Sequence, residues 1–292
     1  ACQYNTAIGY QALKTEVTGD YSTAIGYQAL YTQNRAGTVG NTALGYKAGY
    51  AVTDGWSNTY IGYNAAVAAT TGYEQTIIGA NAGASLTTGD YNTAVGANAL
   101  QNEDIGRGAT AIGYNALNKQ DSNSSDEDSA NVAVGEYAGY DITTGTNNTF
   151  IGAYAGDNAS TTSNNVAIGY KSLGAETGSL LTGGSTVAVG YQAFGVAEGG
   201  EGNGVAIGYR AGRNIGAAGI WIGYEAGMNI SGSAQAINIA IGAGAMRHLS
   251  DNDSQYNVAI GDQALEGNGL TGNVTGNIAI GYHALKVVTS AT

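Results

Sequence analysis

Few side chains in this chain of 292 residues could do chemistry, and their spacing does not favour catalysis. His248 and His283 are the two histidines and Cys2 is the single cysteine, and no two of these three residues have a metal-binding spacing. Catalytic triads and structural zinc sites need such groups in combination. The sequence therefore predicts a protein that is not an enzyme and that has no cofactor, no metal centre and no intrachain disulfide.

Carboxylates gather once, in the segment 121–128, which reads Asp-Ser-Asn-Ser-Ser-Asp-Glu-Asp. Oxygen-rich loops suit Ca²⁺, but this spacing matches no defined calcium loop. We interpret the segment as a solvated insertion, with Ca²⁺ binding left open. Asp121, Asp126 and Asp128 are candidate receptor contacts, because loops that project from a rigid scaffold commonly carry binding residues.

Tyrosine has the most regular spacing of any chemically distinctive residue. Ten tyrosines directly follow a glycine in the same short phrase, beginning with Tyr10, Tyr27, Tyr46 and Tyr63. Stacked at a constant spacing, they would form an aromatic ladder. The rings either join successive structural units or provide a strip on which sugars stack. The first four are therefore candidate receptor contacts as well.

These tyrosines belong to a phrase that recurs sixteen times, first as Asn5-Thr6-Ala7-Ile8-Gly9-Tyr10-Gln11-Ala12-Leu13. The repeat glycines lie at 9, 26, 45, 62, 79, 96, 113, 135, 152, 169, 190, 208, 223, 242, 261 and 281. We number positions within a repeat from this glycine. A period near twenty residues is typical of a solenoid, in which each unit is stable only when stacked on its neighbours. The sequence predicts one all-β solenoid domain over 1–292, with about sixteen coils.

Position −3 is always Thr, Val or Ile, and position −1 is always Ile, Val or Leu. Side chains two residues apart share one face of a strand. We therefore expect Thr6, Ile8 and their equivalents to point into the coil. Position −2, which is mostly Ala as at Ala167 and Ala188, is then expected to face another subunit. This orientation also argues against an ice-binding surface, because such a surface needs exposed threonines.

Two further positions have predicted structural roles. The repeat glycines, including Gly9, Gly26, Gly45 and Gly62, are expected where a corner needs positive φ or where the next coil approaches closely. Asparagine occupies position −4 in ten copies, beginning with Asn5, Asn41 and Asn58. Stacked amides at this position predict a hydrogen-bonded ladder.

Composition narrows the choice of partners. The net charge is −12 with an isoelectric point near 4.3, and the ten Lys and Arg residues are scattered. A nucleic-acid partner would require clustered cations, so none is expected. No apolar run is long enough to span a bilayer, so membrane insertion is not expected either. Because Ala1 lies almost inside a repeat, we expect a processed chain or part of a longer fibre.

The phrase Asn-Thr-Ala-Ile-Gly-Tyr-Gln-Ala-Leu, and especially the segment 238–245, resembles the head repeats of trimeric autotransporter adhesins, whose consensus has a Val-Ala-Ile-Gly core. It also resembles phage tail-fibre-like proteins built from strings of this phrase, which often end in an endosialidase-type intramolecular chaperone. The resemblance covers the whole chain. It implies a left-handed parallel β-roll assembled as a homotrimeric rod.

The expected function is therefore that of a structural fibre or adhesin protein on an extracellular or virion surface. Its trimeric rod would attach to a cell-surface glycan or protein receptor. One alternative is a subunit of a self-assembling extracellular filament, joined through exposed terminal coils. The other is a polysaccharide-binding or polysaccharide-degrading tailspike, which would carry paired carboxylates in a groove.

Overall fold

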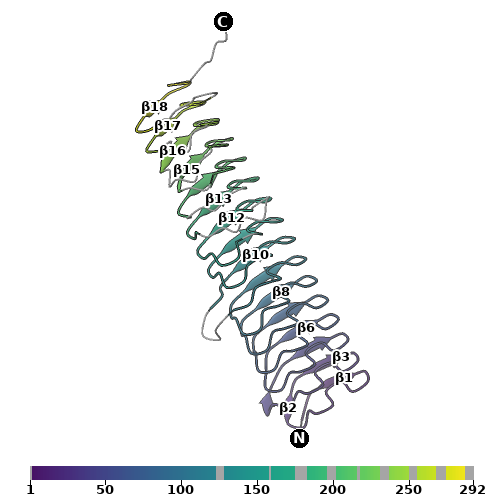
Figure 1. Cartoon of the computed structure of the whole chain (residues 1–292). Coiled ribbons are helices and arrows are strands. Elements are labelled where there is room, and N and C mark those ends of the chain that lie inside the picture. The colour runs from purple at the N-terminus through teal and green to yellow at the C-terminus, as the bar shows by residue number, and fades with distance from the viewer. Residues whose placement is uncertain are drawn as a thin grey trace. The chain divides into compact units, whose positions relative to one another are not determined.

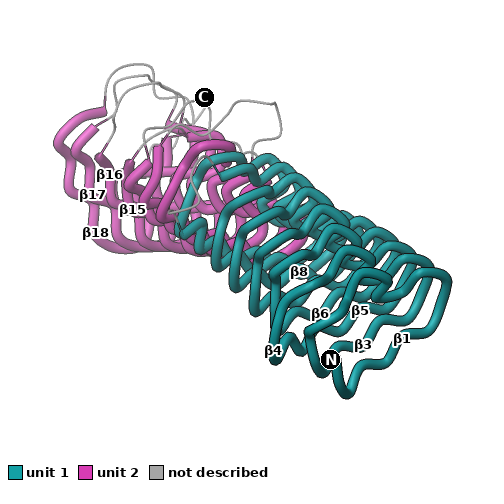
Figure 2. The backbone as a smooth tube through the Cα atoms, turned by 90° about the horizontal axis from the view of Figure 1, so that it is seen from below, with its two compact units in different colours: residues 1–147 teal, residues 148–292 magenta. Residues whose placement is uncertain are grey.

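A computed structural model confirms the predicted architecture, an all-β parallel solenoid. It describes residues 2–122, 128–157, 159–174, 183–195, 202–215, 218–230, 237–249, 255–267 and 274–286, and none of these is helical. Contacts divide the chain into two compact units, residues 1–147 and 148–292. Figure 2 colours the units separately and shows each coil as one loop of the backbone, with successive loops stacked within each unit.

Unit 1 contains eight stacked strands, one from each of its repeats (Figure 1). They are β1 (Thr6–Ile8), β3 (Thr23–Ile25), β5 (Thr42–Leu44), β6 (Thr59–Ile61), β7 (Thr76–Ile78), β8 (Thr93–Val95), β9 (Thr110–Ile112) and β10 (Val132–Val134). A second, two-stranded parallel sheet joins β2 (Gly19–Asp20) to β4 (Gly37–Thr38). The main strands pair in parallel with equivalent residues opposite each other, as at Thr76↔Thr93. The repeat phrase therefore sets both the strand and its register.

Unit 2 follows the same plan with eight further strands. They are β11 (Thr149–Ile151), β12 (Val166–Ile168), β13 (Val187–Val189), β14 (Val205–Ile207), β15 (Gly219–Ile222), β16 (Asn238–Ile241), β17 (Val258–Ile260) and β18 (Ile278–Ile280). Changes in repeat length do not disturb the register, because they fall in the links between strands. Ile207 still pairs with Ile222 across the shortest step.

The predicted orientation of the strand side chains is wrong. The central residue of each short strand points inward, as Ala24 and Ala111 do with no exposed surface, whereas Ile112 is 39% and Ile168 is 37% exposed. Positions −3 and −1 therefore face outward. Alternation places these two positions on one face, but it does not decide which face is inside. The interior is narrow, and in most coils it has room at position −2 only for the methyl group of alanine. The volume of the interior therefore decides which face of the strand is inside.

Position −2 is therefore not a subunit interface. Ala167 and Ala188 are fully buried inside their own coils. Four coils instead place a large side chain at this position, namely Tyr60, Ile77, Phe150 and Trp221. Each of these large side chains is also buried, so it occupies space inside the coil that an alanine would leave empty.

Positions −2 and +4 share the space inside the coil, so that a large side chain at one of them often occurs with a small one at the other. Where position −2 is Ala, position +4 often supplies a large buried side chain, as Leu30 does beside Ala24. Where position −2 is Ile77, position +4 is Gly83, and a Cβ there would lie 3.3 Å from the Ile77 Cγ2. Gly156 stands in the same relation to Phe150. Because interiors are close-packed, a large side chain at position −2 leaves little room at position +4, which is Gly or Ala in all four such coils.

The repeat glycines meet both predicted requirements. Their φ angles lie in the positive range, for example 137° at Gly62 and 123° at Gly169. A Cβ on Gly62 would lie 2.5 Å from the Gly79 carbonyl oxygen of the next coil, and a Cβ on Gly169 would lie 2.7 Å from the Gly190 oxygen. No side chain fits at such a distance from a neighbouring backbone, so this position admits only glycine.

The asparagine ladder is confirmed, but its main bonds run from amide to backbone. The Asn58 Nδ2 donates to the Gly72 carbonyl at 2.8 Å, and the Asn58 Oδ1 accepts from the Gln75 backbone N–H at 3.0 Å. Asn41 makes the equivalent hydrogen bonds: its Nδ2 donates to the Gly55 carbonyl, and its Oδ1 accepts from the Asn58 backbone N–H. Each buried amide thus joins two successive coils. Direct bonds between amides add to this in unit 2, as from Asn165 to Asn148 at 3.0 Å.

Candidate functional site

The outward face of the strands is the first candidate surface, and it consists of two rows in each unit. Positions −3 and −1 form these rows, and their side chains are half-buried or exposed along every strand. Flat sheet faces are normally half-buried by packing against another layer. In the described residues of this chain no second layer covers these rows.

The two units differ in the chemistry of this face. In unit 1, position −3 is Thr in seven of eight coils, from Thr6 to Thr110. In unit 2, seven of eight are Val or Ile, and only Thr149 carries a hydroxyl. Position −1 is aliphatic throughout. Unit 2 therefore presents two aliphatic rows, whereas unit 1 presents one hydroxyl row beside one aliphatic row.

The predicted tyrosine ladder is present at position +1, and its rings stack in parallel. Ring centroids lie 5.4 Å apart from Tyr10 to Tyr27, 5.2 Å from Tyr27 to Tyr46 and 5.1 Å from Tyr46 to Tyr63. In unit 2 the stack runs through Tyr170, Tyr191, Tyr209 and Tyr224 with spacings of 5.1–5.5 Å. Inside each stack the ring faces cover one another. Edges and hydroxyl groups are therefore the parts available to a partner.

Cations lie beside these rings. The Lys47 ammonium lies 5.5 Å from the Tyr46 ring centre and 5.2 Å from that of Tyr50. Arg210 similarly lies over Tyr209 at 5.0 Å. These contacts show that the side chain at position +2 flanks the ring at position +1. At Tyr224 the neighbour at position +2 is a carboxylate, and the charge of Glu225 raises the pKa of the Tyr224 hydroxyl.

A second aromatic column lies in the links of unit 1, and the sequence analysis did not predict it. Trp56 and Tyr73 stack at 4.9 Å, and Tyr91 meets Tyr73 edge-on at 5.2 Å. Arg35 lies over Trp56 at 5.7 Å and Arg107 over Tyr91 at 5.6 Å. The hydrogen bond from the Tyr91 hydroxyl, followed by burial, raises the pKa of Tyr73 to about 12. The recurrence of aromatic residues 17 and 18 positions apart is the signal that could have identified it.

The acidic segment begins on a buried structural corner. The Glu103 carboxylate is fully buried and accepts hydrogen bonds from the Gly106 backbone and Gln120 Nε2, both at 2.7 Å. Burial, and then the charges of Asp104 and Glu103, raise the pKa of the neighbouring exposed Asp121. Asp128 is also exposed. Asp126 lies outside the described residues, so the structure does not place the three carboxylate candidates together.

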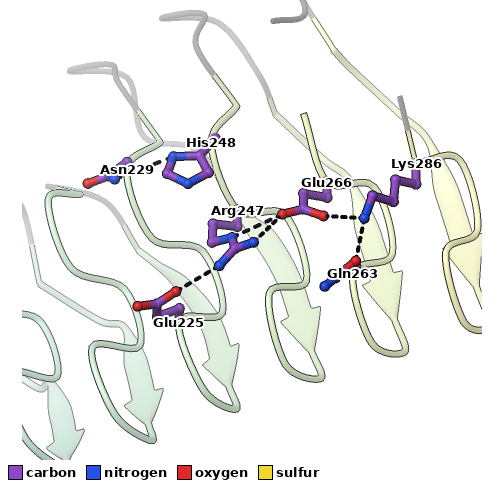
Figure 3. Close-up of polar contacts among 7 residues, drawn as sticks. All are labelled: Glu225, Asn229, Arg247, His248, Gln263, Glu266 and Lys286. Carbon is purple, nitrogen blue, oxygen red and sulfur yellow. Dashed lines mark hydrogen bonds and ion pairs between the residues drawn. The ribbon is translucent and has the colours of Figure 1, made fainter. Parts of the chain in front are cut away.

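Unit 2 carries a row of ion pairs along one edge (Figure 3). Arg247 bonds Glu225 at 2.8 Å and Glu266 at 2.5 Å, and Lys286 bonds Glu266 at 3.0 Å. The four residues come from four successive coils and alternate in sign. Burial tends to raise the pKa of Glu266, but hydrogen bonds from Arg247 and Lys286 outweigh it and lower that pKa overall. The row is a structural ladder of opposite charges.

The described residues contain no helix that could cross a bilayer. No three His, Cys, Asp or Glu side chains among them could hold a metal ion. Comparison of the chain with models of known families, with curated proteins and with solved structures returned no match. The resemblance to adhesin heads and phage fibres therefore stays a prediction.

Proposed function

We propose that this chain is a structural, non-enzymatic fibre segment on an extracellular or virion surface, in which three copies associate through their outward strand faces. The proposal is carried by one observation, the uncovered aliphatic rows at positions −3 and −1. In unit 2 these rows contain Ile168, Ile207 and Ile260, each 37–40% exposed in the single chain. Contiguous apolar surface of this kind is characteristic of interaction sites.

A second copy of the chain suits this face better than an unrelated partner. Apart from Thr149, both rows of unit 2 are aliphatic, so two copies that meet there bury no charge and only one hydroxyl per chain. Parallel copies would also match the coil spacing along the whole face. The proposed number of copies, three, comes from the resemblance to trimeric adhesin heads. Closed symmetry limits the assembly to this number, because no strand face is left open for a further copy.

Attachment is the second part of the proposal. In a trimer joined through the strand faces, the tyrosine edges stay accessible, and each edge would occur three times. Weak contacts then add through effective concentration, provided that the receptor geometry allows simultaneous binding. A cell-surface glycan or protein receptor is the proposed partner.

Light scattering on the purified chain tests the assembly. We expect the mass of three copies for the unaltered protein and the mass of one for Ile168→Asp/Ile207→Asp, with unchanged far-ultraviolet circular dichroism. Tyr191→Ser/Tyr209→Ser, on the adjacent edge, serves as the matched control and should remain trimeric. A monomeric unaltered chain would overturn the proposal.

One observation favours a second function for unit 1. The threonine row faces outward, contrary to the sequence-based expectation, and among the described residues no hydrogen bond engages the hydroxyls of Thr59, Thr76 and Thr93. A regular row of stiff β-branched hydroxyls can order water, as an ice-binding face would. Inhibition of ice growth by the unaltered chain, lost in Thr59→Leu/Thr76→Leu/Thr93→Leu, would support this function. No effect on ice growth would exclude it.

A further inference from the structure

The tyrosine ladder of unit 1 is interrupted at two coils. Position +1 is Tyr63, then Ala80 and Ala97, then Tyr114 in four successive coils. These coils are in register, since β6 to β9 pair strand by strand and Asn81 and Asn98 donate backbone N–H groups to the Tyr63 and Ala80 carbonyls. We call the positions from Tyr63 to Tyr114 the alanine interval.

The alanine interval exposes two aromatic faces that the rest of the ladder covers. One face of Tyr63 stacks on Tyr46, and the other faces the coil of Ala80, where no ring follows. Tyr63 is 55% exposed, compared with 40% for Tyr46 inside the stack. Tyr114 meets Tyr137 edge-on at 5.4 Å, and among the described residues no ring contacts Tyr114 on its Ala97 side. Only the methyl groups of Ala80 and Ala97 occupy position +1 between the two tyrosines.

Amides flank this interval. Position +2 lies beside the ring of position +1, as the Lys47 contacts show, and in these coils it is Asn64, Asn81, Asn98 and Asn115. Within the described part of the chain, the side-chain amide of Asn98 has no hydrogen bond, and that of Asn81 has only a long one of 3.5 Å from the Asn64 Nδ2. Asparagine offers both donors and an acceptor, which is the set that a sugar with several hydroxyls requires.

The interval is wider than a single flat ring. Three coil steps at about 4.8 Å separate Tyr63 from Tyr114 by roughly 14 Å. One flat ring contacting both tyrosines would need only about 8 Å. A saccharide therefore has room to stack on either tyrosine, with its hydroxyls toward Asn81 and Asn98.

A comparable interruption in unit 2 differs in its charge. There Tyr224, Ala243, Asp262 and Tyr282 occupy position +1, and the neighbouring edge carries Glu225, Arg247, Glu266 and Lys286 (Figure 3). Those groups already pair with one another. The alanine interval of unit 1, in contrast, is flanked by neutral amides, and the chain as a whole is acidic. A neutral ligand is therefore favoured over a polyanion.

We propose that the alanine interval is a binding site for a short neutral oligosaccharide. The proposal rests on the attachment function and specifies both the ligand class and the position of the contact. It replaces the predicted sugar strip along the whole ladder, since stacked rings have no free faces and only the ends of a stack can contact a sugar ring.

Adding the missing rings is the sharpest test. Ala80→Tyr/Ala97→Tyr restores the ladder with the residue that ten other repeats use, so the fold should be kept. The probes are cellohexaose, chitohexaose and an array of neutral and sialylated glycans, with affinity measured by calorimetry. We expect binding of at least one neutral glycan, a tenfold or greater loss in Ala80→Tyr/Ala97→Tyr, and a similar loss in Tyr63→Ala/Tyr114→Ala.

Two controls complete the design. Tyr27→Ala removes a ring whose faces are both covered, and Ala243→Tyr adds a ring at the first of the two interrupted positions of unit 2. Both variants should bind within twofold of the unaltered chain. Absence of neutral-glycan binding, or undiminished binding by Ala80→Tyr/Ala97→Tyr, would overturn the inference. Light scattering on the same samples separates the proposals, because a trimer that binds no glycan contradicts this inference and leaves the fibre assembly standing.

Discussion

The indole of Trp221 fills the space that a Cβ atom on Gly227 would occupy, with Cζ3 only 2.6 Å and Cδ2 only 2.7 Å from that position. The two residues belong to one coil, at positions −2 and +4. Gly212 of the preceding coil is crowded by the same indole, at 3.1 Å from Cδ1, and more closely by Phe194, at 2.8 Å from Cε1. One side chain thus determines which residues two coils can accept.

The first prediction concerns this pair. Gly227→Ala should destabilise the protein by about 1–3 kcal/mol from overpacking, in addition to about 1–2 kcal/mol for alanine in the left-handed conformation. Gly244→Ala is the matched control, because Gly244 has nearly the same φ, 63° compared with 65°, and its nearest neighbour is the Gln263 Cγ at 3.3 Å. Urea denaturation measures both.

A double-mutant cycle then identifies the cause. Trp221→Ala alone should cost about 3–5 kcal/mol because it leaves a cavity. In that background the added cost of Gly227→Ala should fall to that of Gly244→Ala. Strictly additive costs would show that the indole is not what excludes the methyl group.

The second prediction concerns the asparagine ladder. Asn58→Ala leaves the Gly72 carbonyl and the Gln75 backbone N–H without the partners that they have at 2.8 and 3.0 Å. Each buried group left unpaired costs about 1–3 kcal/mol, so a loss of about 2–6 kcal/mol in the free energy of unfolding is expected for the two groups together. Asn34→Ala, at an exposed asparagine, should change stability by less than about 0.5 kcal/mol. Equal effects at the two sites would contradict a role for the ladder.

The third prediction is a pH dependence. The pKa of Glu266 in the folded protein lies below the ordinary value of 4.5. The unfolded state therefore binds the proton first, and the stability that Glu266 contributes is present above pH 4.5 and is lost as pH falls through its lower folded pKa. Urea titrations at several pH values should show a smaller loss on acidification for Glu266→Gln than for the unaltered chain. Glu136→Gln, at an exposed carboxylate, should follow the unaltered profile; an identical profile for Glu266→Gln would refute the prediction.

The fourth prediction separates the inside of the coil from its outside. Ala167→Glu forces a carboxylate into a fully buried position and should prevent folding, because no partner is available there. Ile168→Glu, one residue later on the outward face, should fold and lose its self-association. Circular dichroism and light scattering distinguish the two results. A folded, monomeric Ala167→Glu would restore the interface that the sequence first indicated.

The sequence predicted the solenoid, the strand positions and the glycine and asparagine roles because each of these depends on spacing alone. It did not predict which face of each strand is inside the coil. The alternation of side chains fits either orientation, and only the volume of the interior distinguishes the two. The signal was nevertheless present: Phe150 and Ile77 at position −2 occur with Gly156 and Gly83 at position +4. All four large residues at position −2 occur with Gly or Ala at position +4 of the same coil, and this pairing indicates that they point into the coil.

The candidate sites were predicted less completely. Spacing placed the tyrosines in a column, but it did not give the ring planes, so the covered and free faces could not be told apart. The column of Trp56, Tyr73 and Tyr91 lies in links of variable length, where distance from the repeat glycine is not constant. Side-chain packing determines the ring orientation and the geometry of the links, and the spacing of the sequence repeat does not.

Near-identical coils pose a problem that the Trp221 contacts help to solve. A strand such as Val166–Ile168 could pair almost equally well with several others, so a nascent solenoid could close one coil out of step. The indole occupies space beside Gly212 of the preceding coil, and pairing with the coil before that one would place Phe194 at the same position. The few large inward side chains therefore favour the correct pairing of coils, because they make it lower in free energy than a pairing shifted by one coil.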